Sequence, residues 1–278
     1  MALNFTPEIW SAMMLESLKK NLVYGDPSVV NRDYDGEISA QGDTVHIRSI
    51  SRPTISNYTK GATLTYETLT DADRTLLIDQ AKSFSFVVDD IDKAQQPGGA
   101  LEGALTEATY SLRDVADQYI AGLYTGAASA NAIGTVSVTT AALAYTQLRR
   151  LKVKLDEANV PQQGRFVVVP AWYHGLLLEE DKFVRVDASG TDQALRNGIV
   201  GRALGFDVLM SNNAPLVTGD DYAVIAGYPK AISFAEQINK VEAYRPEDSF
   251  SDALKGLHVY GAKLVRPDGI ATVIASQT

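Results

Sequence analysis

Histidines 46, 174 and 258 are the only imidazole groups in the chain that could act as a base or bind a metal ion. His174 is followed by Glu179 and Glu180, which stand five and six positions further on. On a helix, ligands of one metal ion share a face when they are three or four residues apart. These two carboxylates therefore lie off the face that His174 would use, and no third ligand is near.

His46 and His258 both lie in patterns typical of strands. His258 alternates with Tyr260, as expected for a histidine packed in or at the rim of a sheet. His46 has Asp43 and Arg48 close by, and such an acid and base could support catalysis. Strand alternation, however, places His46 and Arg48 on one face and Asp43 on the other.

Paired carboxylates could also supply an acid and a base, but in turns they are mostly solvated charges or helix caps. The pairs are Asp71 and Asp73, Asp89 and Asp90, Glu179 and Glu180, and Asp220 and Asp221. The glycine cluster GGALEG at 98–103 opens a helix without the strand and the distant acid of a dinucleotide site. The absence of cysteine excludes disulfides and thiolate-ligated metal sites. Because no other group of residues forms a convincing constellation, we predict no catalytic, cofactor or metal site.

Composition indicates a folded globular chain: 45% of its 278 residues are hydrophobic and 21% are charged, enough for one large or two ordinary domains. The net charge of −9 and the scattered basic residues disfavour specific nucleic-acid binding. The N-terminus lacks the pattern of a secretory signal, and no apolar run is long enough to span a membrane.

Roughly the first 80 residues have little core of their own by pattern. Apolar spacing predicts a helix over residues 7–22, followed by an extended arm. A strand begins at Thr44, and a returning strand covers residues 75–88, with a Thr-rich tip around Lys60 between them. Because a two-stranded ribbon is marginal alone in water, the rest of the fold or a neighbouring copy must pack on it.

The remaining residues predict a mixed α+β fold. A long helix with one buried face covers residues 101–123. A second helix, capped by Thr139 or Thr140, precedes the buried strand 166–169. Five more strands are expected in the segments FDVLMSN, DYAVIAG, AISFA, LHVYGAKLVRP and GIATVIA.

Several segments resemble the major capsid proteins of tailed bacteriophages. NGIVGRALGFDVLMSNNAP (197–215) is similar to a Gly-rich turn and Gly-Phe-Asp-Val strand of that family. GDTVHIR resembles the strand that enters its extended loop, PGGALEGALTEATYSLRDVADQYIAGLY its spine helix, and GLHVYGAKLVRPDGIATV its closing strands. The resemblance implies an N-terminal arm (1–40), an extended β-ribbon loop (41–90), a peripheral domain with the spine helix (91–138 and 228–278) and an axial α/β domain (139–227).

By the same resemblance, the chain would be a structural protein of the virion rather than an enzyme. Pentamers and hexamers of it would form an icosahedral head, built in the cytoplasm of the bacterial host, that encloses double-stranded DNA without binding it specifically. A portal and possibly a cement protein would be further partners. Because relatives often carry a cleaved scaffolding segment and this chain begins with Met near the arm, we expect a separate scaffolding protein, unless such a segment was removed.

Within that reading, Arg48, Arg52 and Lys60 are candidate contacts with acidic surface on the next subunit. An encapsulin-like nanocompartment shell is an alternative within the same fold. A soluble α+β hydrolase that uses His174 or His46 is an alternative from another class.

Overall fold

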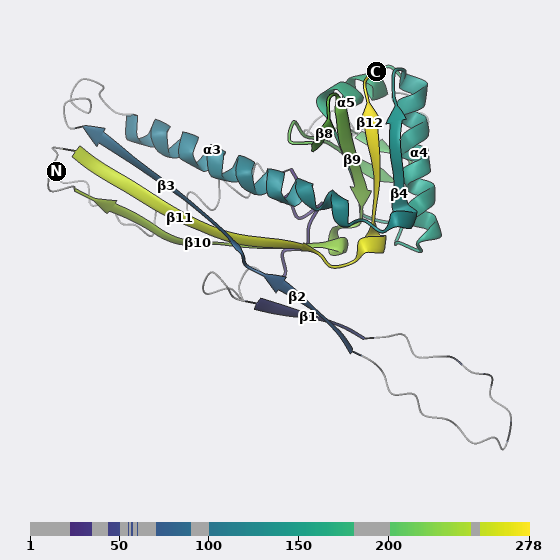
Figure 1. The fold of residues 1–278 in the computed structure, drawn as a ribbon, viewed down its shortest axis with the longest axis horizontal. Helices are drawn as coiled ribbons and strands as arrows, with labels where there is room; N and C mark the ends of the chain where they lie inside the picture. Colours follow the sequence, from purple (N-terminus) through teal and green to yellow (C-terminus); the bar gives the residue numbers. More distant parts are fainter. Residues whose placement is uncertain are drawn as a thin grey trace.

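A computed structural model describes residues 23–34, 44–50, 55, 57, 60, 71–89, 100–180, 201–245 and 251–278. The described elements form an elongated molecule with a large sheet and two helices at one end (Figure 1). A narrow sheet lies along one long helix and extends away from that end, and a two-stranded ribbon projects from its base. The predicted helix at 7–22 lies outside the described residues.

The large sheet has seven strands in the order β4-β12-β9-β5-β7-β6, with β8 paired to β9. Neighbours β4 and β12 are parallel, as are β5 and β7, and the other pairs are antiparallel. The strands are β4 (Ala132–Ser137), β5 (Arg165–Val169), β6 (Gly201–Ala203), β7 (Phe206–Met210), β8 (Leu216–Thr218), β9 (Asp221–Gly227) and β12 (Ile270–Ser276).

Two helices, α4 (Ala141–Glu157) and α5 (Ala171–Leu178), cover one face of this sheet and close its first core. The hydroxyl of Thr140 accepts a hydrogen bond from the N–H of Leu143, which confirms the predicted cap. Every residue of β5 is buried, as its continuous apolar run predicted. Leu148 and Leu151 of α4 are fully buried in this core.

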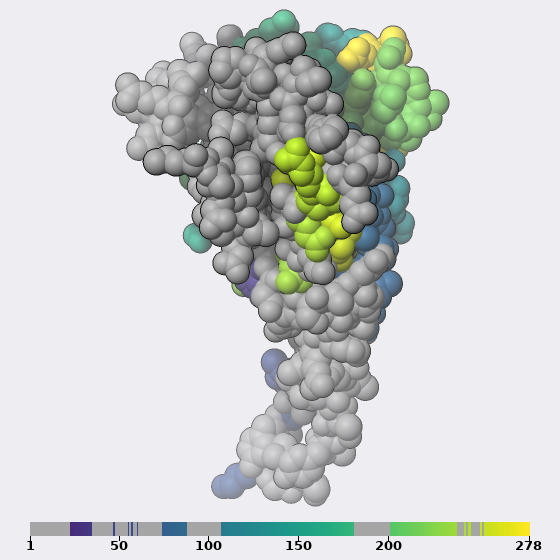
Figure 2. Space-filling view, turned by 90° about the vertical axis from the view of Figure 1, so that its left-hand side faces the viewer, coloured from purple at the N-terminus to yellow at the C-terminus, as the bar shows by residue number. Residues whose placement is uncertain are grey.

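The narrow sheet has the order β10-β11-β3, all antiparallel. Its strands are β10 (Ile232–Tyr244), β11 (Ser251–Leu264) and β3 (Gln80–Asp89), and the spine helix α3 (Ala100–Ala121) runs beside them. The predicted strand AISFA is thus only the start of a 13-residue strand. Figure 2 looks at the molecule from the far end of this sheet, with yellow-green atoms of β10 and β11 near the centre.

The ribbon consists of β1 (Thr44–Ile50) and β2 (Asp71–Leu77) in antiparallel register. The sequence predicted one returning strand here, but the structure divides it at Ile78 and Asp79. After this break, β3 leaves the ribbon and joins β11. Ile78 is fully buried at the break, where it packs in a small cluster with Leu76 and Val259. The ribbon is therefore anchored by the narrow sheet.

A second core joins the two sheets. Phe166 and Val168, on the face of β5 opposite to the helices α4 and α5, pack with Ile120 of α3 and Phe234 of β10. Short 3-10 turns connect the sheets: η1 (Gly122–Gly126), η2 (Ser129–Asn131), η3 (Pro229–Ala231) and η4 (Pro267–Gly269). Strands β4 and β12 fall within the predicted peripheral domain by residue number, but in the structure they pair with strands of the predicted axial domain. No helix among the described residues is both long and apolar enough to cross a membrane.

Candidate functional site

The sequence-predicted contact residues belong to the ribbon segment. Arg48 lies in β1 opposite Asp73 of β2, and its side chain is not among those described. Lys60 lies in an exposed turn. Arg52 and Asp43 fall outside the described residues.

The histidines lie on three different elements: His46 on β1, His174 on α5 and His258 on β11. Burial lowers the pKa of His174. Of the four acidic pairs, Asp71 and Asp73 lie on β2, whereas Glu179 and Glu180 follow α5. Within the described residues, no three His, Asp or Glu side chains come close enough together to hold a metal ion.

One buried carboxylate, Asp117 on α3, joins three separate parts of the chain. Its carboxylate accepts a hydrogen bond of 2.7 Å from the N–H of Tyr24 and one of 3.1 Å from Nδ2 of Asn213. The backbone N–H groups of Val23 and Gly25 also donate to it. Burial raises the pKa of Asp117, although these hydrogen bonds act in the opposite direction. Asp117 thus fixes residues 23–25 and the turn after β7 to the spine helix.

A second buried polar cluster contains Arg32, Glu236 and His258, which come from three separate segments. The guanidinium of Arg32 pairs with Oε1 of Glu236, and Nε2 of His258 lies 3.2 Å from Oε2 of the same carboxylate. The side chains of Glu236 and His258 are fully buried. Arg32 also lies over the ring of Phe234, at 5.1 Å from the ring centroid. One carboxylate therefore holds both an arginine and a histidine inside the fold.

The environment of His258 favours the neutral imidazole. Burial and the nearby charge of Arg32 lower the pKa of His258 to about 4. In the neutral form, an N–H at Nε2 can donate to Glu236. Nδ1 is buried and has no hydrogen-bond partner among the described residues. The ring also lies 4.9 Å from that of Tyr260, whose pKa burial raises to about 12.

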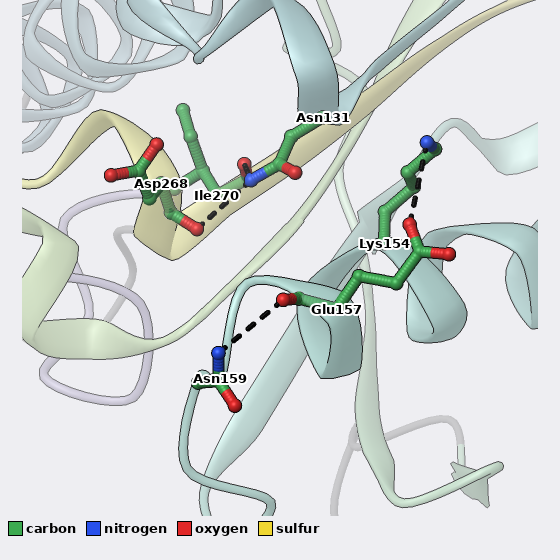
Figure 3. A network of polar contacts seen from close by, with 6 residues as sticks. All are labelled: Asn131, Lys154, Glu157, Asn159, Asp268 and Ile270. Atoms are coloured by element: carbon green, nitrogen blue, oxygen red, sulfur yellow. Dashed lines mark hydrogen bonds and ion pairs between the residues drawn. The ribbon is translucent and has the colours of Figure 1, made fainter.

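A pocket of about 280 Å³ opens where the ribbon, the end of α4 and the η4 turn meet. Arg74, Asn159 and Asp268 are among its lining residues, and Arg74 donates a hydrogen bond to the carbonyl oxygen of Val265. Figure 3 shows two sides of this region. Nδ2 of Asn131 donates to the carbonyl oxygen of Asp268 at 2.9 Å, and Nδ2 of Asn159 donates to that of Glu157 at 3.4 Å. These bonds hold the connecting turns.

Sequence reasoning did not single out Arg32, Asp117 or Glu236. The sequence did contain a hint that Glu236 is buried. Glu236 stands two residues after the buried Phe234 in β10, so both side chains point to the same face of the strand. Asp117 likewise follows the buried Ala116 within the apolar repeat of α3. A charged residue at a core-facing position is seldom buried without a partner.

Comparison with known proteins gives a consistent result. The sequence model of a family described as phage capsid protein matches residues 53–273. A solved structure from Mycobacterium phage Che8 is 36% identical, with a TM-score of 0.74 over 98% of each chain. The capsid structure of cyanophage P-SCSP1u is 16% identical, with a TM-score of 0.74 over 94% of this chain and 90% of that one. No curated protein matches the sequence.

A third solved structure, from the mature capsid of bacteriophage PhiM1, is 19% identical, with a TM-score of 0.67 over 89% of this chain and 88% of that one. The α+β fold with arm, ribbon, spine helix and axial sheet agrees with the sequence-based resemblance. These matches favour the phage shell over the nanocompartment and the hydrolase. The chain belongs to the phage capsid protein family and is a structural major capsid protein of the virion shell.

Proposed function

We propose that copies of this capsid protein assemble as pentamers and hexamers into an icosahedral head that encloses double-stranded DNA. The observation that carries this proposal is the family match over residues 53–273 together with the 36% identity to the Che8 structure along the whole chain. Assembly takes place in the cytoplasm of the bacterial host. The net charge of −9 supports enclosure of the DNA without specific binding.

The exposed apolar side chains of the narrow part support contacts with neighbouring copies. Leu77 of β2, Val87 of β3, Tyr110 of α3 and Tyr244 of β10 each expose about half of their surface or more. Large apolar side chains exposed together mark interaction surfaces, and obligate interfaces bury about 2,000 Å² or more. We assign the narrow sheet and the spine helix to assembly, and the comparably exposed side chains of Leu178 on α5 and Leu216 on β8 are further candidate contacts.

The division into a 1–40 arm, a 41–90 ribbon loop, a peripheral domain and a 139–227 axial domain is part of the same proposal. In it, β4 and β12 connect the peripheral domain with the axial sheet that they enter. A separate scaffolding protein, a portal and a cement protein are the partners proposed for assembly. The axial domains meet at the centre of each capsomer.

The test is electron microscopy of the purified protein together with sedimentation. We expect closed shells or capsomers, and a well-behaved monomer at all concentrations would contradict the proposal. Replacing Arg48, Arg52 and Lys60 together with Glu should reduce assembly, because these cations are proposed to meet acidic surface on the next subunit. Arg149→Glu, on the exposed side of α4, serves as the control.

The DNA content of the shells separates the phage head from a nanocompartment. Shells isolated from infected cells should contain double-stranded DNA. Shells that contain enzymes and no DNA would instead support the nanocompartment.

A further inference from the structure

Residues 23–34 dock against the free edge of β10. The N–H of Asn31 donates to the carbonyl oxygen of Ile232 at 2.8 Å, and the N–H of Phe234 donates to that of Asn31 at 2.9 Å. This forms a single parallel bridge between Asn31 and Ser233. The docked segment, drawn in purple in Figure 1, leads back to the first 22 residues of the chain.

Apolar side chains of this segment complete the second core. Tyr24, Val29 and Val30 are each no more than 1% exposed. They pack in the cluster that contains Ile120 of α3 and Phe234 of β10. If the segment left β10, these side chains would enter water and the joint between the two sheets would lose part of its core.

Arg32 of this segment pairs with Glu236 of β10, and the same carboxylate contacts His258 of β11. We propose that this cluster is an acid-sensitive latch. Near neutral pH, uncharged His258 donates to Glu236, which binds Arg32 and holds residues 23–34 on β10. In acid, protonated His258 places a second cation beside Arg32 and releases the segment.

Protonation of His258 should destabilise the docked state for two reasons. A protonated His258 would carry an N–H at Nδ1, where the described residues provide no acceptor. Its charge would lie in a fully buried site beside Arg32, with the carboxylate of Glu236 in contact with both cations. Charges of like sign in a buried site repel strongly because little solvent screens them.

Other ionisable groups occur on the elements around His258, and Lys82 of β3 is its register partner. The remaining described ones are Tyr24, Asp26, Asp33 and Tyr34 in the docked segment, Arg74 of β2 and Asp79 after it, Glu107, Tyr110, Arg113, Asp114, Asp117 and Tyr119 on α3, Glu242 and Tyr244 on β10, and Lys255, Tyr260 and Lys263 on β11. The carboxylate of Asp117 is occupied by Tyr24 and Asn213, and Glu242 pairs with Lys255 at 2.8 Å. Among these groups and the cluster itself, Glu236 is the carboxylate that contacts His258, at 3.2 Å.

The segment should leave before the hairpin opens. Strands β10 and β11 are joined along their whole length, with register partners from Ile232 and Leu264 to Tyr244 and Ala253. The docked segment has one bridge to β10. Moving Arg32 away therefore relieves the repulsion with far fewer broken backbone hydrogen bonds than separating the two strands.

The dependence on pH follows from linkage. His258 has its pKa lowered from the ordinary 6.5 to about 4, so the docked state binds protons less readily than the released state. The docked state therefore loses stability as the pH falls from 6.5 through about 4. If the released histidine regains its ordinary pKa, the equilibrium constant for release rises about fiftyfold between about pH 7 and about pH 4.5.

Hydrogen exchange of the purified full-length chain tests the latch. Protection of residues 29–34, corrected for the intrinsic exchange rate, should fall about fiftyfold from about pH 7 to about pH 4.5, while β9 and β12 stay protected. His258→Gln keeps an N–H donor for Glu236 but does not titrate in this range. In this variant we expect the protection of residues 29–34 to change less than about threefold over the same pH range.

The matched control is His174→Gln, which removes a histidine from α5 and should behave as the wild type. An equal fall in wild type and His258→Gln would overturn the latch, as would constant wild-type protection. If His258→Gln does not fold, the comparison of residues 29–34 with β9 and β12 in the wild type still tests the latch. Simultaneous loss of protection in residues 29–34, β9 and β12 would then mean global unfolding and contradict a local release.

Discussion

The seven-stranded sheet and the narrow three-stranded sheet obtain their stability in different ways. In the first, β5, β9 and β12 are buried almost throughout, and α4 and α5 close a core on one face. In the second, the central strand β11 is buried along most of its length, whereas β3 alternates between half-buried and exposed residues. The axial end can fold around its own core, whereas the extended end gains much less burial within one subunit.

The largest test of this contrast is Leu151→Ala in α4. Leu151 is fully buried in the first core, so its truncation should leave a cavity and lower the free energy of unfolding by about 2 to 5 kcal/mol. Val153→Ala on the same helix is the control, because Val153 is 47% exposed. Chemical denaturation measures both. Equal effects of the two substitutions would contradict a self-contained axial core.

A smaller effect is expected from Gly261→Ala at the base of the narrow sheet. A Cβ atom at Gly261 would lie 2.4 Å from the carbonyl oxygen of Leu77, so the backbone at the break between β2 and β3 must shift. We expect a loss of roughly 1 to 3 kcal/mol in the free energy of unfolding. Gly122→Ala, whose Cβ would meet nothing within 4 Å, is the matched control. Equal free energies of unfolding for the two variants would contradict the anchoring of the ribbon at Gly261.

The smallest effect concerns the joint between the regions. Because burial raises the folded-state pKa of Asp117, its stabilising contribution is present below the unfolded pKa and is lost as the pH rises through the folded value. Asp117→Asn keeps an acceptor for Tyr24 and should remove this dependence, with a change at neutral pH within about 1 kcal/mol. Denaturation at several pH values compares it with Asp114→Asn on the same helix. A pH profile unchanged from wild type would show that Asp117 does not titrate as expected.

Asp117 and His258 thus respond to acid with opposite signs, although both hold residues 23–34. Protonation of Asp117 favours the folded state, and protonation of His258 opposes it. The fall of about fiftyfold expected for residues 29–34 is the contribution of His258, and measuring it in wild type and in Asp117→Asn removes the opposing contribution of Asp117. Variants at both positions separate the contributions.

Regular elements with continuous patterns could be predicted from the sequence. Three examples are the spacing of apolar residues in α3, the cap at Thr140 and the apolar run of β5. Each of these local patterns predicted an element that the structure contains. The full length of β10 could not be predicted, because polar residues after Glu236 obscure its alternation and it contains a bulge between Ile238 and Lys240. The break at Ile78 could not be predicted either, because no glycine or proline interrupts the strand pattern there.

The two polar clusters could not be predicted for a different reason. Asp117 and Asn213 are 96 residues apart, and Arg32 and Glu236 are 204 apart. Neither pairing has a local signature, because any of the 34 acidic side chains could in principle partner a given cation. The docking of residues 23–34 against α3 and β10 brings these residues together.

The length of the β10–β11 hairpin has a geometric consequence. Strands of 13 and 14 residues extend about 40 Å from the base at Ile232 and Leu264. At that radius, a rotation of about 10° at the base carries the far end through about 7 Å. A difference of a few degrees between subunits would therefore move the far end of the hairpin by about 2 to 4 Å.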